Sequence, residues 1–156
     1  STIVGVSAGL SGPLAPVEAF RWTEEGGMEG LGQVAYEIPG SPFDGITRRT
    51  EAFAVSEDGS VIVGGAEAAW IYAEQYGGMV AVRDLLIMLG VTGLDDWELF
   101  EAVDVSADGK VITGWATNRT LGAEDYAWIA VIPEPSTALL LGLGLAALAR
   151  RPECER

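Results

Sequence analysis

Acidic side chains are the main groups in this chain that could carry out catalysis or bind metal. The chain contains no histidine, so Ser–His catalysis and histidine-based zinc sites are excluded. Its only cysteine, Cys154, lies close to the C-terminus, so the chain is not a disulfide scaffold. The chemistry left to consider is that of carboxylates, which is general acid–base catalysis or cation binding.

Two aspartates recur at equivalent positions, because segment 54–64 is repeated at 104–114 with an offset of 50 residues. A paired-carboxylate enzyme needs two such groups facing each other across a substrate. Here each aspartate is followed by glycine between short β-prone runs, as Asp58-Gly59 and Asp108-Gly109, and Asp-Gly is a strong hairpin-turn signal. We expect turns of different repeat units to lie far apart. We therefore interpret both pairs as structural turns and predict no catalytic residue.

Other acidic clusters and one triplet also call for an interpretation. Asp95-Asp96 with Glu98 and Glu101, or Asp104 with Asp108, lack the loop spacing and mid-loop glycine of a calcium site. We predict no metal site and no cofactor. The triplet 118–120 fits an N-glycosylation acceptor, and we interpret it as a chance match.

The body of the chain is organised as a repeat. The segment ending in Val61-Ile62-Val63-Gly64 is matched by 111–114, and its last part reappears at 2–5. A tryptophan segment follows each copy, at 18–22, 67–71 and 125–129, and Gly-Gly-Met follows in the first two. A period of about 40–50 residues suggests propeller blades or solenoid units. We expect units at about 1–40, 51–90 and 102–132.

Each unit is predicted to be a four-strand antiparallel meander. The chain is then mainly β, forming an open, partial propeller-like stack, because three units are too few to close a propeller. Trp22, Trp70 and Trp128 are expected to be buried between units. Residues 41–50 are predicted to form a polar loop. Residues 83–90 have apolar residues at helical spacing and are predicted to form a short helix that ends at Gly90.

The charge of the chain is strongly negative. The net charge is −14, and all of it lies before Pro133, because acidic and basic residues cancel beyond that point. Such a surface repels nucleic acid and anionic membranes, so we expect no nucleic-acid partner. The chain opens at Ser1 in the middle of a repeat and shows no N-terminal signal sequence. We therefore expect a fragment or a mature form of a longer precursor.

The last part of the chain, 133–156, has a different composition. Pro133-Glu134-Pro135 is followed by an uncharged run at 136–149, and then by Arg150-Arg151. Both prolines oppose strand pairing, so the folded body should end near Ile132. As a helix the run would be about 21 Å long, short of the ~30 Å hydrocarbon core, and the arginines at its end favour a cytoplasmic C-terminus. A buried core helix and a permanent anchor are the alternatives for this run.

These three parts, in this order at the C-terminus, resemble the PEP-CTERM sorting signal of Gram-negative bacteria. The resemblance implies that Pro133, Glu134 and Pro135 are read by an exosortase, a membrane enzyme that processes its substrates near this motif. It implies a transmembrane helix at 136–149 and a basic end at 150–156, with Arg150 and Arg151 as the membrane stop. Before Pro133 the chain resembles HAF-type extracellular repeats, through 18–22 and 67–70, with Glu18 where histidine is typical.

Together these features predict an exported, non-enzymatic surface or extracellular-matrix protein. The resemblance implies transient anchoring in the inner membrane, then release or attachment at the cell surface, with exopolysaccharide or matrix as a partner. The alternative is a carbohydrate- or protein-binding module that uses aromatic residues on the rims of its repeats. A glycan-processing enzyme is a third class, and it would need acidic side chains that converge in a pocket.

Overall fold

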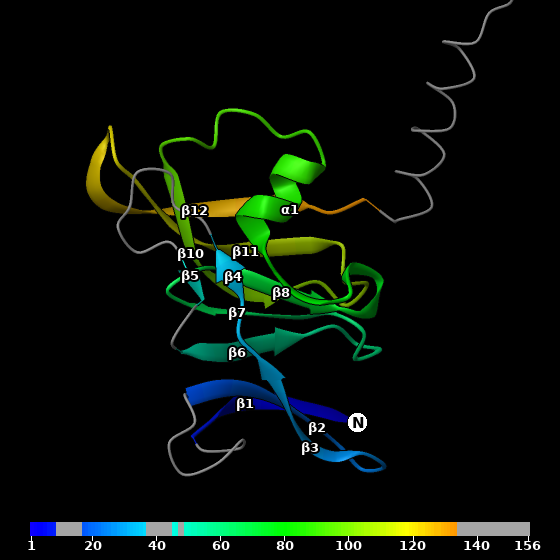
Figure 1. Cartoon of the computed structure of the whole chain (residues 1–156). Coiled ribbons are helices and arrows are strands. Elements are labelled where there is room, and N and C mark those ends of the chain that lie inside the picture. The colour runs from blue at the N-terminus through cyan, green and yellow to red at the C-terminus, as the bar shows by residue number, and fades with distance from the viewer. Residues whose placement is uncertain (9–16, 37–44, 47–48, 134–156) are drawn as a thin grey trace, which may run out of the picture.

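The computed structural model describes residues 1–8, 17–36, 45–46 and 49–133, and it shows a mainly β chain of antiparallel sheets (Figure 1). This confirms the predicted fold class. The strands fall into three successive groups, which we call unit 1, unit 2 and unit 3. Unit 1 holds β1 (Thr2–Ala8), β2 (Val17–Thr23) and β3 (Gly27–Gly32). Unit 2 holds β6 (Thr50–Val55), β7 (Ile62–Ala66), β8 (Trp70–Ala73) and β9 (Gly78–Ala81). Unit 3 holds β10 (Trp97–Val105), β11 (Val111–Asn118) and β12 (Gly122–Val131).

Unit 2 is the four-strand meander that the sequence predicts, with β6, β7, β8 and β9 paired in chain order. Units 1 and 3 differ from the prediction, because the described residues give each of them three strands. Among the described residues, no strand of unit 1 takes the place of β6 beside β1, and no strand of unit 3 takes the place of β9 beside β12. The first strand of unit 3 begins at Trp97, earlier than the expected start of that unit.

The segment between units 1 and 2 is not wholly a loop. Strand β4 (Ala35–Tyr36) pairs with β5 (Gly45–Ile46). Strand β5 lies inside the stretch at 41–50 that was predicted to be a polar loop. Strand β6 then begins at Thr50, which was the last residue assigned to that loop.

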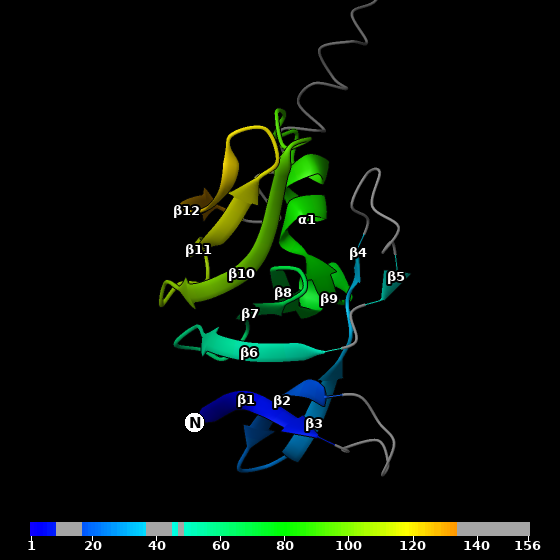
Figure 2. The ribbon, with the colours of Figure 1, turned by 90° about the vertical axis from the view of Figure 1, so that its left-hand side faces the viewer.

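The units stack on one another (Figure 2). In unit 2, the middle one, the residues of β7 and β8 alternate between two interfaces. On β7 and β8, Ile62 and Trp70 belong to a buried cluster with Ala19 and Val34 from the unit 1 side. Their neighbours Val63 and Ile71 belong to a second cluster, shared with unit 3 and the helix. Because side chains alternate faces along a strand, successive residues of these two strands point in turn toward unit 1 and toward unit 3.

A buried polar contact also ties unit 1 to unit 2. The Thr50 side chain is fully buried; its Oγ1 accepts from the Ala19 N–H at 3.0 Å and donates to the Gly32 carbonyl at 2.8 Å. Both hydrogen-bonding functions of the hydroxyl are therefore used within the interface. At the interface between units 2 and 3, a backbone hydrogen bond replaces this side-chain contact: the Ala69 N–H donates to the Leu99 carbonyl at 2.8 Å.

The one α-helix among the described residues, α1 (Val82–Met88), follows β9 directly and confirms the helix predicted at 83–90. It buries Val82, Leu85 and Leu86 against the core shared by units 2 and 3. Gly90 follows with φ +87°, a conformation that glycine adopts at little cost, and the helix has ended by that point as predicted. The short 3₁₀ helix η1 (Glu74–Tyr76) connects β8 to β9.

Candidate functional site

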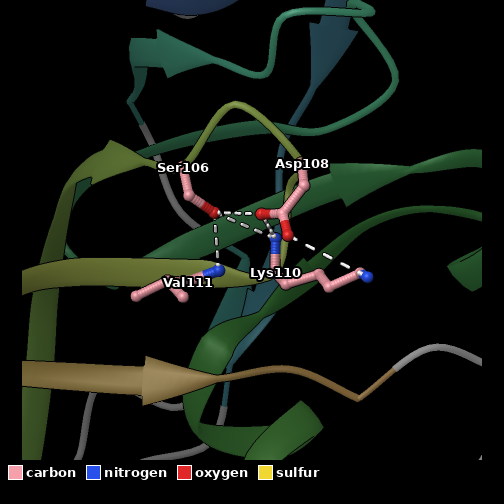
Figure 3. A network of polar contacts seen from close by, with 4 residues as sticks. All are labelled: Ser106, Asp108, Lys110 and Val111. Atoms are coloured by element: carbon pink, nitrogen blue, oxygen red, sulfur yellow. Dashed lines mark hydrogen bonds and ion pairs between the residues drawn. The ribbon is translucent and has the colours of Figure 1, made fainter.

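The two Asp-Gly segments form closely similar hairpin turns, and the carboxylate organises each of them. Figure 3 shows the turn of unit 3. In unit 3, Asp108 Oδ1 accepts from Ser106 Oγ at 2.6 Å and from the Lys110 N–H at 3.2 Å. Ser106 Oγ in turn accepts from the Val111 N–H at 2.9 Å. The Lys110 ammonium lies 3.9 Å from Asp108 Oδ2. The predicted structural role of these turns therefore has a physical basis.

The turn in unit 2 repeats this network around Asp58. Its Oδ1 accepts from Ser56 Oγ at 2.7 Å, from the Ser60 N–H at 3.0 Å and from Ser60 Oγ at 2.7 Å. Gly59 has φ +77°, and Gly109 has φ +72°, which explains why glycine follows the aspartate in both copies.

These hydrogen bonds favour the ionised carboxylates. The Ser60 N–H, followed by the hydroxyls of Ser56 and Ser60, lowers the pKa of Asp58 to about 2. The Ser106 hydroxyl, followed by the Lys110 N–H, lowers the pKa of Asp108. A general acid near neutral pH needs a raised pKa, so both shifts run against that role.

The lowered pKa predicts how the contribution of Asp58 to stability changes with pH. A carboxylate with pKa 3.8 when unperturbed and about 2 in the fold stabilises the fold fully above pH 3.8. That contribution falls as the pH falls through 3.8 toward about 2, where the folded group is protonated as well. The stability gap between the natural chain and Asp58→Asn should therefore be constant near neutral pH and should narrow below pH 3.8.

Thermal unfolding midpoints measured across this pH range test the prediction. Glu57→Gln is the matched control, because it removes the same charge from an exposed side chain of the same turn. If the difference in stability between the natural chain and Asp58→Asn did not change with pH, the assigned role of the carboxylate would be contradicted.

The two turns lie side by side, so the expectation that they would be far apart is wrong. The Glu57 N–H donates to the Ala107 carbonyl at 3.0 Å and links the turns directly. The turns are adjacent because the units stack in register, which brings equivalent segments together. Each carboxylate nevertheless bonds to groups of its own turn, so the pair does not converge on a common point as catalytic carboxylates do.

Three of the other acidic candidates have separate local partners. Glu98 forms an ion pair with Arg119 at 2.7 Å, and Asp96 accepts from Thr120 Oγ1 at 3.0 Å. Asp104 accepts from the Val105 N–H at 2.9 Å. Within the part of the chain that the structure describes, no three His, Cys, Asp or Glu residues form a potential metal site.

The triplet at 118–120 has a structural role in the turn between β11 and β12. The Asn118 side chain is buried, and its Oδ1 accepts from the N–H groups of Thr120 and Leu121, both at 2.9 Å. Asparagine is favoured here because its side chain can bond the backbone two residues further on.

Among the described residues, hollows lie between elements at two places. One, of about 330 Å³, is lined by Arg21, Asp58 and Glu74 at the contact of units 1 and 2. The sequence does not reveal that Asp58 and Glu74 line the same hollow, because their proximity depends on how the chain folds back after β8. Arg21 also forms a 2.8 Å ion pair with Glu29, and Asp58 is engaged in its turn. The second hollow, of about 350 Å³, is apolar and lies beside α1 and β12.

The aromatic residues only partly follow the predicted pattern. Trp70 is fully buried, and Trp128 packs on the core that units 2 and 3 share. Their counterpart in unit 1 is Phe20 and not Trp22, because the repeat glycines Gly5, Gly64 and Gly114 pair with Phe20, Trp70 and Trp128, respectively. Trp22 and Trp128 are both partly buried, but only Trp128 packs against a core cluster of the described residues, so the predicted place of Trp22 in the core between units is wrong. The well-exposed aromatics Phe53 and Trp115 belong to different units.

The last described strand ends just before Pro133, the residue that was expected to oppose strand pairing. Strand β12 ends at Val131, and the Ile132 N–H donates to the Lys110 carbonyl at 2.7 Å. Pro133 follows outside the strand, since it has no N–H to donate. Glu134, Pro135, the apolar run and Arg150-Arg151 lie outside the described residues. Among the described residues, no helix is long and apolar enough to span a membrane.

Comparison with known families identifies this end of the chain. A family model described as the PEP-CTERM protein-sorting motif matches residues 131–151. None of the curated proteins and none of the solved structures matches the chain. The matched residues begin at the last strand residue and extend to the basic pair, while the likeness of the body to HAF-type repeats stays a prediction. The chain therefore carries the signal of an exported protein that an exosortase sorts to the cell surface.

Proposed function

We propose that this chain is the non-enzymatic β body of a surface or extracellular-matrix protein. The observation that carries the proposal is the PEP-CTERM match at 131–151, which begins where the last strand of the body ends. An enzyme that recognises a peptide motif needs a segment whose backbone is not hydrogen-bonded to a neighbouring strand of a sheet. Pro133 cannot donate to such a ladder, so the motif begins at the boundary of the fold.

The carboxylates of the body support a structural role. Asp58 and Asp108, the most enzyme-like candidates in the sequence, each hold a hairpin turn and have lowered pKa values. The repeat turns therefore account for these residues without any substrate. A protein of this kind contributes a rigid, negatively charged body to the cell surface or its matrix, and exopolysaccharide is the partner we propose for it.

We also propose that membrane anchoring is transient. Residues 136–149 would hold the precursor in the inner membrane, with Arg150 and Arg151 on the cytoplasmic side. The exosortase would then act near Pro133-Glu134-Pro135 and separate the body from this run. The short length of the run suits a temporary anchor better than a permanent one.

The test is a triple substitution, Pro133→Ala, Glu134→Ala and Pro135→Ala, in a host that carries an exosortase. We expect the variant to keep its full mass and stay in the inner-membrane fraction, whereas the natural chain is shortened and reaches the surface. Fractionation and mass spectrometry of the intact protein measure both results.

Two controls make this test specific. Pro152→Ala changes a proline beyond the basic pair and should be processed normally. The natural chain in a host without exosortase should behave like the triple variant. A mature product of unchanged size and location for the triple variant would refute the sorting role.

A further inference from the structure

Unit 1 departs from the repeat at one position that faces unit 2. Strand pairing defines this position, because in every unit its residue lies opposite the residue just before the repeat glycine. Arg21 occupies it in unit 1, where units 2 and 3 have Ile71 and Ile129. Ile71 is 1% exposed in the core that units 2 and 3 share. An arginine here gives up apolar packing, and such a departure from the local pattern is expected at a functional site.

A hollow lies beside Arg21, between units 1 and 2, and has a volume of about 330 Å³. Its other walls are the Asp58 turn of unit 2 and the segment 73–75, which includes the start of η1. Ligand pockets in proteins start at about 300 Å³, so the hollow suits one small ring and not an extended ligand.

The guanidinium of Arg21 is held in place at the hollow. Its Nη2 donates to Glu29 Oε2 at 2.8 Å, and its Cζ lies 5.6 Å from the centroid of the Tyr72 ring. Among the described residues, Glu29 is its hydrogen-bond acceptor, and this bond uses one of the five N–H groups of an arginine. The other N–H groups remain to donate to a ligand, from a side chain whose position is already fixed.

Acceptor groups line the rest of the hollow. Asp58 uses Oδ1 for the hydrogen bonds of its own turn, which leaves Oδ2 as an acceptor. Glu74 and Gln75 are exposed residues of η1, and the amide of Gln75 both donates and accepts. Donors and acceptors are therefore both present within one small hollow.

The charges at the hollow disfavour a charged ligand. Glu29 neutralises Arg21, so an anion gains little from the guanidinium. The carboxylates of Asp58 and Glu74 repel an anion, and a cation would have to lie next to the guanidinium. A sugar ring has no net charge, and each of its hydroxyl groups both donates and accepts, as a serine hydroxyl does. It can therefore bond to the arginine and to the carboxylates at the same time.

We propose that this hollow binds one neutral sugar unit of a polysaccharide. Arg21 and Gln75 donate to its hydroxyl groups, and the carboxylates of Asp58 and Glu74 accept from them. The identity of the partner as a matrix polysaccharide rests on the function proposed above, whereas the binding itself does not. A weak contact of this kind gains strength when many copies of the protein meet many sugar units of one polymer.

Nuclear magnetic resonance of the full chain tests the proposal. The chain is kept in a detergent without sugar groups and is titrated separately with D-glucose, D-galactose and D-mannose. We expect at least one of them to shift the amide signals of 58–61 and 73–75, with a Kd of about 1 mM, the weak end of specific binding. The equivalent turn of unit 3, at 108–111, is the internal control, and its signals should not move.

Two charged probes test the class of ligand. The uronate of the sugar that binds has the same ring with one carboxylate added, so it should bind at least about threefold more weakly than the neutral sugar. Putrescine is a cation without hydroxyl groups, and it should need a higher concentration than the sugar to shift the same signals.

Arg21→Ile gives unit 1 the residue that the other units have at this position. It should weaken sugar binding by at least about tenfold. The thermal unfolding midpoint should not fall, since an apolar residue replaces a partly buried ion pair. Gln75→Ala removes an exposed amide and should weaken binding about threefold. Arg119→Ile is the matched control, because it removes the same charge and a similar 2.7 Å ion pair, with Glu98, in unit 3. It should bind the sugar like the natural chain.

Any of three results would overturn the proposal. The first is that none of the three sugars shifts the signals of the hollow at about 20 mM, roughly twenty times the expected Kd. The second is that putrescine shifts them at a lower concentration than the sugar, which would make the hollow a cation site. The third is that folded Arg21→Ile and Gln75→Ala both bind as tightly as the natural chain. Because sorting is tested through 133–135, a failure of binding is distinguishable from a failure of the sorting role.

Discussion

Gly64→Ala should destabilise the fold by about 3 kcal/mol or more, the upper end of the cost of overpacking a core. A Cβ at this position would lie 1.9 Å from the Glu51 carbonyl oxygen and 2.4 Å from the Trp70 ring. The carbonyl belongs to the backbone of β6, which pairs with β7 here, so it cannot move aside without breaking the sheet. Thermal unfolding should show the midpoint lowered by roughly 10 °C.

The repeat supplies its own controls for this substitution. Gly114 meets the Glu101 carbonyl oxygen at the same 1.9 Å, so Gly114→Ala should be similarly destabilising. In unit 1 a Cβ on Gly5 would meet only the ring of Phe20, at 2.9 Å, and that side chain is partly exposed and can rotate. Gly5→Ala should therefore cost less than about 1 kcal/mol. Equal losses at all three glycines would show that backbone flexibility, and not the close strand crossing, explains their recurrence.

The local features of this fold were predictable from the sequence. Asp58-Gly59 and Asp108-Gly109 specify their turns through contacts within a few residues, and α1 follows from apolar spacing over a single segment. The end of β12 before Pro133 was also predictable, because proline has no N–H to donate to a strand ladder.

The stacking details depend on long-range register and were missed. The motif match placed Trp22 beside Trp70 and Trp128, but strand pairing sets Gly5 opposite Phe20, two residues earlier. A shift of two residues keeps a side chain on the same face, so alternation alone could not expose the error. The contact between Glu57 and Ala107 was missed because the sequence does not reveal how close successive units approach.

Trp70→Ala should be the most destabilising truncation in the body, costing about 3–5 kcal/mol. The side chain is fully buried between units 1 and 2, in the cluster with Ile62 and Ala19. Its loss would leave a cavity where backbones are tied by the β7–β8 ladder, so collapse would be incomplete. Trp22→Ala, at a partly buried residue of the same type, should cost clearly less. Denaturant unfolding of both variants measures the difference.

Trp70→Phe separates packing from hydrogen bonding at this site. The indole Nε1 of Trp70 is buried and has no acceptor among the described residues, and the equivalent Trp128 Nε1 shares this feature. A buried donor without a partner costs about 1–3 kcal/mol, so phenylalanine removes that penalty while it gives up some packing. Phe20 already fills the equivalent place in unit 1, where phenylalanine is compatible with the glycine opposite it. We therefore expect Trp70→Phe to lose less than half the stability that Trp70→Ala loses. A loss as large as that of alanine would mean that the indole makes an interaction other than packing.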